Sequence, residues 1–452
     1  MTDMKIFMEK LFLAAKAAGM EEYELYSQGG ATFTVQIFNG EVSQYTDSTS
    51  FGISFRGKYN GKMGYASSER VDDSVIEFLV NSAKECAQII EEEEVEEIYP
   101  GDPKYPTVDT YSDALNAVDA ERKIAAAIQV EASCKAADSR IQAVPYCTLG
   151  SMETEVFIAN SKGLDISRKA NGMYSYAYAQ AAEGTSVKMD GDVFSGLDFD
   201  KFNPEELGKS VAQKAVSKLG AESVPSAKYA VVFDNSAAAD LLSTFLSGFS
   251  AEHAQKGFSL LKGKIDSEIA SPAVTIIDDP LMVGQFGTTP FDSEGVASYT
   301  KTVVDGGIFK TFLHNTKSAK KDGVKSTGNG FKRDFKSPVA ISATNFFIKP
   351  SDTSQAELLA KMGEGIMITD LQGLHSGANP ISGDFSLSAD GFLIEGGKVT
   401  RPIEQITISG NFFQMLKDVT AVGNELEFKM PSFTGNVASP SVWVAALDVA
   451  GI

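Results

Sequence analysis

Two Asn-Gly dipeptides near the start of the chain constrain its fold more than any other local feature. Asn39-Gly40 and Asn60-Gly61 each separate stretches in which apolar and polar residues alternate, as in a half-buried strand. Because Asn and Gly tolerate the positive φ angles of a tight hairpin turn, each pair predicts two antiparallel strands. We therefore expect a meander over about residues 33–63, between an opening amphipathic helix and a second helix over 73–90.

The next hundred residues repeat this plan. A helix is expected over 119–137, alternating strands over 155–159 and 173–179, and a further helix that opens at Pro204, a favoured first-turn residue. Beyond residue 225 the sequence pattern changes and predicts short strands separated by Gly-rich turns.

The pattern predicts an α+β protein with two N-terminal meander-plus-helix units, related as a duplication, and a β-rich C-terminal domain. The expected boundaries are 1–100, 101–224 and 225–452. In the last domain we expect a strand at 229–233, a helix over about 236–249, and a final strand from Val442 that is buried on both faces.

Composition narrows the function classes. The formal net charge of −20 over 452 residues disfavours broad binding to nucleic acid or to an anionic membrane. Three scattered cysteines without a CxxC motif are typical of a reducing compartment, and no apolar stretch approaches the roughly 20 residues of a membrane span. We expect a cytoplasmic protein. The acidic run Glu91–Glu97 is interpreted as a solvated linker before Pro100.

Motifs of common hydrolases are absent from the sequence. It holds only three histidines, His253, His314 and His375, and neither HExxH nor HExxxH, in which two zinc ligands share one helix face. GxSxG, GxxxxGK[ST] and GxGxxG before a helix are absent too. A site of scattered histidines or a dispersed Ser/His/Asp triad stays open, since such residues need not be close in sequence.

Pairs of carboxylates are the strongest remaining candidates. Asp278 and Asp279 end a predicted strand at 273–277, Asp292 and Glu294 follow a Gly-containing loop, and Asp384 stands in a tight turn. Such residues could bind a cation or act as acid and base, but more often they anchor loops through backbone N–H groups. We assign these five residues to loop anchoring or to the lining of a substrate chamber, and no residue to catalysis or metal binding.

Motifs along nearly the whole chain resemble the TldD/PmbA family, also described as "modulator of DNA gyrase". They are Phe38-Asn39-Gly40-Glu41, Gly52-Ile53-Ser54, Lys256–Lys264, Asp278-Asp279-Pro280, Phe291–Val296, Ser326–Gly330, Ser382–Ser386, Gly391–Lys398 and Ser409-Gly410-Asn411-Phe412.

The resemblance implies a heterodimeric peptidase that processes unfolded polypeptides or peptide precursors. In that pair the TldD subunit carries HExxxH on a helix and a distant C-terminal Cys, which together bind zinc. Alignment on Lys256-Gly257 places the two family histidines near Leu242 and Ser247, and no Cys follows Gly423. The chain therefore resembles the PmbA/TldE branch, and zinc is expected in a TldD-like partner but not here.

The expected function is that of a PmbA/TldE-like subunit of a TldD/TldE-type metallopeptidase complex, inactive alone. Its expected partners are a TldD-like HExxxH subunit, an unfolded peptide substrate and, when the first is missing, a second copy of itself. Two alternatives stay open: a self-sufficient hydrolase with an unconventional site, and a non-catalytic regulator of DNA gyrase.

Overall fold

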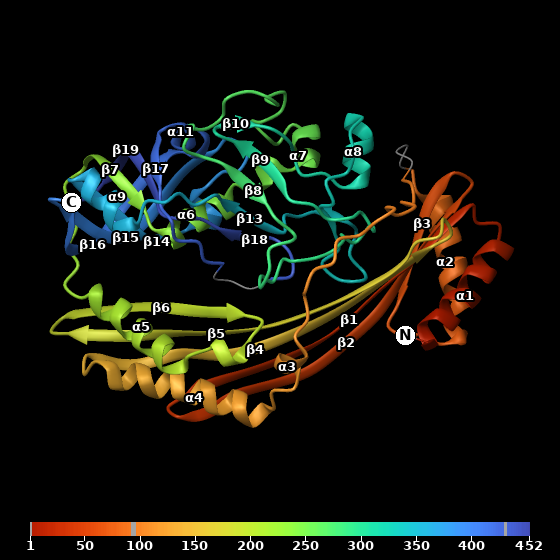
Figure 1. The fold of residues 1–452 in the computed structure, drawn as a ribbon, viewed down its shortest axis with the longest axis horizontal. Helices are drawn as coiled ribbons and strands as arrows, with labels where there is room; N and C mark the ends of the chain where they lie inside the picture. Colours follow the sequence, from red (N-terminus) through yellow and green to blue (C-terminus); the bar gives the residue numbers. More distant parts are fainter. Residues whose placement is uncertain (1, 92–95, 429–431) are drawn as a thin grey trace.

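A computed structural model describes residues 2–91, 96–428 and 432–452 of the chain. One long antiparallel sheet with helices at its two ends forms the N-terminal half. A β-rich C-terminal half lies across the face of the sheet that points away from α4 and α5 (Figure 1). The predicted α+β class, with N-terminal strand-and-helix units before a β-rich domain, is confirmed.

The first sheet has six strands in the order β3-β2-β1-β4-β5-β6, all antiparallel. Its strands are β1 (Glu22–Phe38), β2 (Glu41–Tyr59), β3 (Lys62–Ser68), β4 (Ile141–Asn160), β5 (Asp165–Glu183) and β6 (Ser186–Gly196). Both predicted hairpins are present: φ is 54° at Asn39 and 80° at Gly40, and Asn60 and Gly61 repeat this geometry.

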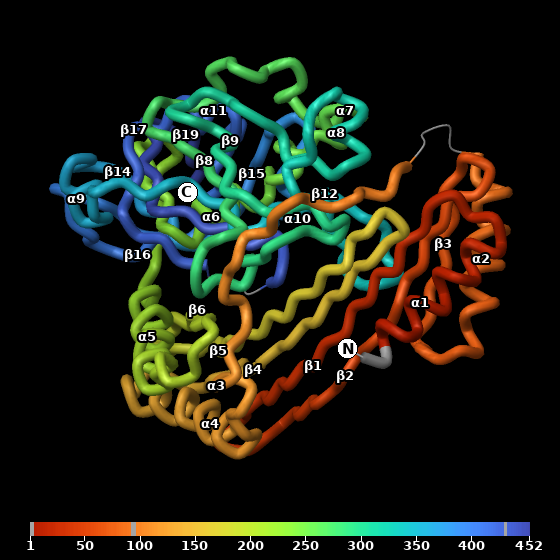
Figure 2. The backbone as a smooth tube through the Cα atoms, turned by 45° about the vertical axis from the view of Figure 1, so that its right-hand side comes forward, coloured from red at the N-terminus to blue at the C-terminus, as the bar shows by residue number. Residues whose placement is uncertain are grey.

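The two meander units join along β1 and β4, which pair from Glu24 opposite Asn160 to Gln36 opposite Thr148. Each unit has the same order of elements, helix, three strands and helix, as the repeat predicted. The predicted boundary at residue 100 therefore separates two sequence units that share one sheet. Figure 2 shows the long strands running side by side across both units.

Helices cover the two ends of this sheet (Figure 1). At one end α1 (Thr2–Ala17) and α2 (Ile76–Ile89) bury Leu11, Leu79 and Phe55 in a common core. At the other end α4 (Ala120–Ala137) and α5 (Pro204–Ser217) pack on the sheet through Val130 and Val211. The short α3 (Asp113–Asn116) precedes α4. These apolar stripes explain why the helices dock, because burial of each stripe removes apolar surface from water.

The C-terminal half contains a closed sheet and an open one. The closed sheet runs β16-β15-β14-β7-β19-β17, and pairing of β16 with β19 completes a barrel. Its strands are β7 (Ala227–Phe233), β14 (Gly365–Gln372), β15 (Asp384–Glu395), β16 (Lys398–Asn411), β17 (Val419–Val422) and β19 (Val442–Ala450). Because closure satisfies the edge strands' backbone groups, the barrel is a self-contained scaffold for its loops.

The open sheet runs β10-β9-β8-β13-β18 and packs into the same apolar core. Its strands are β8 (Ile276–Asp278), β9 (Lys301–Asp305), β10 (Ile308–Phe309), β13 (Asn345–Ile348) and β18 (Asn436–Ala438), beside a small ribbon of β11 (Gly330–Phe331) and β12 (Ala340–Ile341). The surrounding helices are α6 (Asn235–Thr244), α7 (Ala251–Gln255), α8 (Thr316–Asp322), α9 (Gln355–Met362), α10 (Leu374–Gly377) and α11 (Phe412–Lys417).

Three local predictions need correction. The helix expected over 236–249 ends as α6 at Thr244 and continues as a 3₁₀ turn over Leu246–Phe249, because Phe245 leaves helical geometry with φ −99° and ψ 7°. The strand expected over 273–277 is β8, three residues at Ile276–Asp278. The final strand β19 is not buried on both faces, since a bulge between Val444 and Leu447 shifts the alternation and exposes the two alanines between them.

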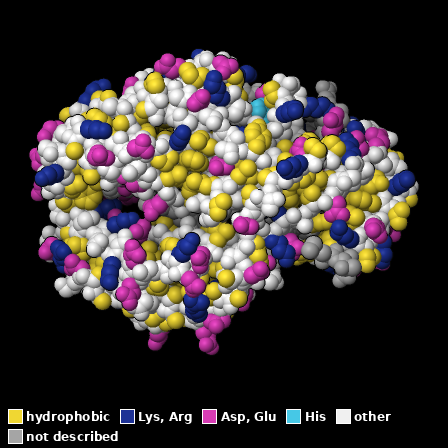
Figure 3. All heavy atoms as spheres, viewed as in Figure 1, with side chains coloured by type: hydrophobic (Ala, Val, Ile, Leu, Met, Phe, Trp, Pro, Cys, Tyr) yellow, Lys and Arg dark blue, Asp and Glu magenta, His cyan; other side chains and the backbone are white. Residues whose placement is uncertain are grey.

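Residues 92–95 of the acidic run lie outside the described part of the chain, so its interpretation as a linker stays a prediction. Among the described residues, no helix combines the length and apolar character needed to cross a bilayer. Basic and acidic side chains are mixed over the face of the molecule seen in Figure 3.

Candidate functional site

A cleft of about 1460 Å³ lies where the β2–β3 end of the first sheet meets the C-terminal half. Its walls are β2 and β3, the segment 96–102 that leaves the first unit, the C-terminal loops 294–299 and 332–339, and the segment 315–326, which contains α8. Segments from both halves thus enclose a space large enough for several residues of an extended peptide.

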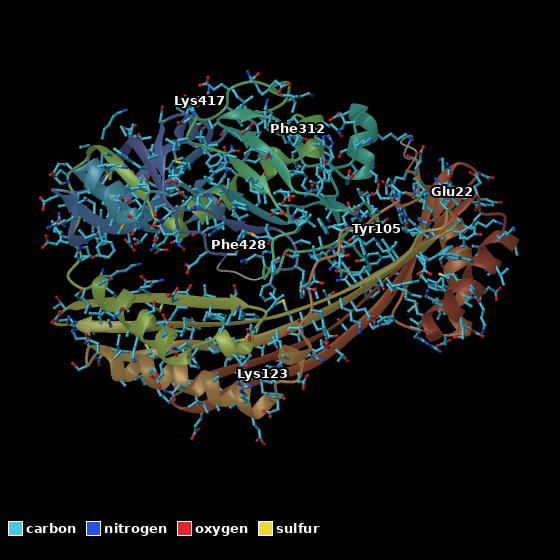
Figure 4. All side chains as sticks on the ribbon, viewed as in Figure 1. Glu22, Tyr105, Lys123, Phe312, Lys417 and Phe428 are labelled. Atoms are coloured by element: carbon cyan, nitrogen blue, oxygen red, sulfur yellow. The ribbon has the colours of Figure 1, made fainter. Side chains whose placement is uncertain are left out.

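The segment after Pro100 ties the two halves together at this cleft. The hydroxyl of Tyr105, labelled in Figure 4, donates to the carbonyl of Gly295 at 2.7 Å, and its ring packs edge-on against Phe291. Asp102 accepts a hydrogen bond from the Ala297 backbone at 2.8 Å. The loop that carries Asp292 and Glu294 is therefore held from the N-terminal side as well.

Asp278 is fully buried at the end of β8, where it organises three separate segments. Its carboxylate accepts hydrogen bonds from the backbone N–H and hydroxyl of Thr344 and from the side-chain amide of Asn329, all within 2.7–2.8 Å. Lys301 Nζ lies 3.1 Å from the second oxygen and also donates to the carbonyl of Thr327. With every partner supplied by protein, Asp278 is built as a structural anchor.

Asp292 and Glu294 form a second buried group. Asp292 accepts three backbone hydrogen bonds, from Glu294 and Val296 in its own turn and from Gly330 in β11, at 2.9–3.0 Å. Burial, followed by the charge of Glu294, outweighs these donors and raises the pKa of Asp292 to about 8. Burial also raises the pKa of Glu294, whose carboxylate accepts from the backbone N–H of Thr316 at 2.8 Å and from its hydroxyl. Glu294 reaches the cleft wall, and Asp292 stands behind it.

The other two predicted residues lie apart from this pair. Asp279 is partly exposed and holds the turn after β8 by accepting from the Leu281 backbone and the Thr300 hydroxyl. Asp384 is exposed at the start of β15 and accepts from the amide of Asn411 on β16 at 2.9 Å. None of Asp278, Asp279, Asp292 and Asp384 lines the cleft, so the structure gathers only part of the predicted set near it.

Sequence reasoning missed the charged residues Arg56 and Lys332, which line the cleft from its two sides. Arg56 on β2 pairs with buried Glu24 on β1, Nε to Oε1 at 2.8 Å. Lys332, just after β11, donates from Nζ to the Ser54 hydroxyl at 2.9 Å and lies 4.9 Å from the centre of the Tyr26 ring. The available signal was alternation: Glu24 and Tyr26 on β1, and Ser54 and Arg56 on β2, stand two residues apart and so share a sheet face.

The helix that resembles the family's metal helix offers no zinc ligand at the two positions that align with the family's histidines. On α6 Leu242 is 1% exposed within the apolar core, and Ser247 in the following turn has only a neutral hydroxyl. Zinc needs imidazole, thiolate or carboxylate donors, which these positions do not supply. Among the described residues, no group of three or more His, Cys, Asp or Glu side chains is placed to hold a metal ion. The residues therefore do not fit a peptidase zinc site.

The three histidines are dispersed in the structure as in the sequence. His314 is buried beside the Ser318 hydroxyl, and burial lowers its pKa. His253 packs edge-on against Phe258, and His375 is exposed on α10. Burial raises the pKa of Tyr178 on β5, and the carboxylates of Asp190, Asp370 and Asp240, the last of which belongs to α6, raise it further.

These features define a class of protein: a two-part α+β molecule with a long sheet, a barrel and a cleft between the two parts. The chain belongs to the PmbA/TldD family. The family models for PmbA/TldA metallopeptidase domain 1, for the central domain and for the C-terminal domain match residues 23–87, 113–219 and 226–451, respectively.

Individual relatives agree with this assignment. The chain is 27% identical over 432 residues to a protein named "Metalloprotease PmbA homolog" from Haemophilus influenzae, covering 94% of this chain and 92% of that one. It is 34% identical to a crystallised putative modulator of a DNA gyrase from Thermotoga maritima, covering 99% and 100% of the two chains with a TM-score of 0.91. TldE from Thermococcus kodakarensis, at 23% identity, covers 98% and 100% with a TM-score of 0.89 and so shares the fold.

Proposed function

We propose that this chain is the metal-free subunit of a peptidase complex, in which a homologous partner with an HExxxH helix supplies the zinc. The observation that carries the proposal is the chemistry of α6. At the two positions that align with the family's zinc ligands, the chain has a buried leucine on α6 and a serine in the turn after it, and neither side chain can supply a zinc ligand. The names of the curated relatives support a peptidase-like role for the family.

An extended polypeptide is the substrate that the cleft suits best. Within the described part of the chain, β3 is one of the two outermost strands of the first sheet, and its residues 65–67 line the cleft. The free side of an edge strand offers backbone N–H and C=O groups that can pair with any extended peptide, with little dependence on its sequence. An unfolded segment could therefore lie along β3 and run toward the partner's metal.

The three unpaired thiols support the proposed cytoplasmic location. Cys86 is partly exposed, Cys134 and Cys147 are buried, and none forms a disulfide. Reduced cysteines in these settings fit a reducing compartment.

The test is to mix the purified chain with a homologue from the same genome that carries HExxxH, and to follow cleavage of an unfolded, dye-quenched peptide. The mixture should cleave much faster than either protein alone, and a chelator should abolish the gain. Cleavage of the peptide by this chain alone, at a rate that a chelator abolishes, would refute the metal-free subunit.

A gain-of-function control sharpens the experiment. A zinc hydrolase needs about three protein ligands and an open position for water. Ser247→His adds one ligand at most, so the variant should bind no stoichiometric zinc by elemental analysis and should gain no chelator-sensitive cleavage of the unfolded peptide when it is assayed alone. A chelator-sensitive peptidase created by this single change would contradict our description of α6.

A further inference from the structure

The cleft holds a serine and a lysine in contact, supplied by the two halves of the molecule. Ser54 lies on β2 in the first sheet, and Lys332 follows β11 in the C-terminal half; Nζ and Oγ are 2.9 Å apart, and both residues line the cleft. A hydroxyl within hydrogen-bond reach of an amine is the arrangement that nucleophilic catalysis requires of a serine and its base.

The segment that carries Lys332 is held firmly in place. The backbone N–H of Lys332 donates to the Ser293 hydroxyl at 3.1 Å, and Asp292 accepts from Gly330 two residues earlier. On the sheet side, Phe335 packs onto Gly52, where a Cβ atom would lie only 2.3 Å from the ring. The absence of a side chain at Gly52 lets this loop close on β2 beside Ser54.

The surroundings of Lys332 make its neutral amine more accessible than that of an ordinary lysine. Burial, then the like charge of Arg56, lowers its pKa to about 8, although Glu24, Asp334 and Glu96 act in the opposite direction, and the Tyr26 ring covers one side. Relative to the ordinary pKa of 10.5, this raises the neutral fraction near pH 7 roughly 300-fold, to about one molecule in ten. A neutral amine is the form that can accept a proton.

We propose that Ser54 and Lys332 form a nucleophile and general-base pair that hydrolyses small, carboxylate-bearing esters or amides in the cleft. Lys332 Nζ accepts the hydroxyl proton as Ser54 Oγ bonds to the acyl carbon. The bond from that carbon to the leaving group then breaks, and Lys332 returns its proton to the departing oxygen or nitrogen. Water, deprotonated by Lys332, cleaves the acyl-serine ester and restores the Ser54 hydroxyl.

The preference for an anionic substrate rests on the charge of the cleft. Eight of its lining residues are Lys or Arg and four are Asp or Glu, in a chain whose net charge is −20. Ion pairs with carboxylates engage five of the eight, namely Arg56, Lys162, Lys317, Lys320 and Lys336, so the preference for an anionic substrate depends most on Arg56 beside Ser54. Arg56 stands two residues from Ser54 on the same sheet face, and Nε makes its hydrogen bond to Glu24. The rest of its planar guanidinium can meet a carboxylate, which Arg binds with two parallel hydrogen bonds.

This activity goes beyond the proposed function and needs no metal, so the two can fail independently. If the HExxxH homologue and this chain together cleave the peptide no faster than either alone, the metal-free subunit is refuted, but the proposal for Ser54 and Lys332 is not affected. The test for Ser54 is therefore made on the full chain alone in the presence of a chelator.

The experiment treats the full chain with a fluorophosphonate probe, locates the label by peptide mass spectrometry, and follows hydrolysis of a nitrophenyl acetate and of a nitrophenyl hemisuccinate. We expect label on Ser54, faster hydrolysis of the anionic ester, and a rate that rises as pH passes through about 8. Ser54→Ala and Lys332→Met should each lower the rate about a hundredfold or more. Ser48→Ala on the same strand and Lys310→Met, both outside the cleft, should change nothing.

The variant Lys332→Arg distinguishes loss of the catalytic base from loss of the fold. Arginine keeps the positive charge and can still donate to Ser54, but it cannot act as a base because it stays protonated. A folded but unreactive Lys332→Arg protein supports the proposal. Absence of label on Ser54 in the wild type, or undiminished hydrolysis in either the Ser54→Ala or the Lys332→Arg protein, overturns it. Equal rates on the two esters overturn the assignment of an anionic substrate.

Discussion

The buried ion pair between Asp278 and Lys301 gives the sharpest stability prediction. Asp278→Asn keeps the shape of the side chain but replaces one accepting oxygen with an amide that can only donate. The groups facing this side chain, from Lys301, Asn329 and Thr344, are themselves donors, so at least one contact becomes a donor facing a donor. In addition, the ammonium of Lys301, whose side chain is 1% exposed, loses its counter-ion.

Breaking a buried pair in this way costs about 3–5 kcal/mol, because the remaining charge stays desolvated. For a unit of about 150–250 residues, 1 kcal/mol corresponds to about 2–4 °C, so we expect the melting temperature of the C-terminal half to fall by about 10 °C. Trp443 on β19 is the only tryptophan in the chain, and its fluorescence therefore reports on this half directly.

The matched control is the adjacent Asp279→Asn. Asp279 is partly exposed, and its Oδ1 accepts both bonds, from Leu281 and Thr300, which an asparagine carbonyl can retain. Its cost should stay below about 1 kcal/mol. Adding Lys301→Met to Asp278→Asn should recover part of the loss, because the uncompensated charge is removed. If Asp278→Asn melts within error of Asp279→Asn, or if Lys301→Met recovers nothing, the argument from buried charge is wrong.

Three further outcomes are expected. The folded pKa of Asp292, about 8, lies above its usual 3.8, so the stability it contributes is complete below about pH 3.8 and is lost as pH rises through 8. Asp292→Asn should therefore flatten the fall of the unfolding midpoint between pH 5 and pH 8. Gly64→Ala should lower the free energy of unfolding by about 2 kcal/mol or more, measured by circular-dichroism melting, because the new Cβ would lie 1.7 Å from a backbone oxygen of α2. The control Gly196→Ala should melt nearly as the wild type, because its Cβ would meet only a ring edge at 3.4 Å. A thiol reagent should react promptly with partly exposed Cys86 and, before denaturation, only slowly with the other two cysteines, because burial raises their pKa to about 11 and about 12.

Features set by neighbours in sequence were predictable. The turn at Asn39-Gly40 needs only the two residues that adopt positive φ, and both hairpins follow from it and its repeat at residue 60. The start of α5 is equally local, because Pro204 occupies its first turn and Asn203 caps it by accepting from the next two backbone N–H groups. The carboxylates were recognised as a class because Asp and Glu at predicted turns and strand ends are typical of loop anchors.

Features set by distant residues were not predictable from one sequence. Lys332 meets Ser54 across 278 positions, and nothing near either residue indicates the other. From the sequence alone Lys301 resembles an ordinary surface lysine, because only the pairing of β8 with β9 places it beside Asp278. The bulge in β19 likewise depends on its partners β7 and β17, since an apolar alternation of Val, Trp and Ala carries no mark of a register shift.

The pairing of β1 with β4 bears on how the chain can be divided for experiments. A fragment cut near residue 100 would retain β1 but lose β4, and the thirteen residues from Glu24 to Gln36 would present a bare strand edge to solvent. At about 3.3 Å per residue this edge would be roughly 40 Å long, and edges of that length recruit other chains. The first unit should therefore aggregate or pair with a second copy when expressed alone, whereas co-expression of both units as separate polypeptides should restore one soluble sheet.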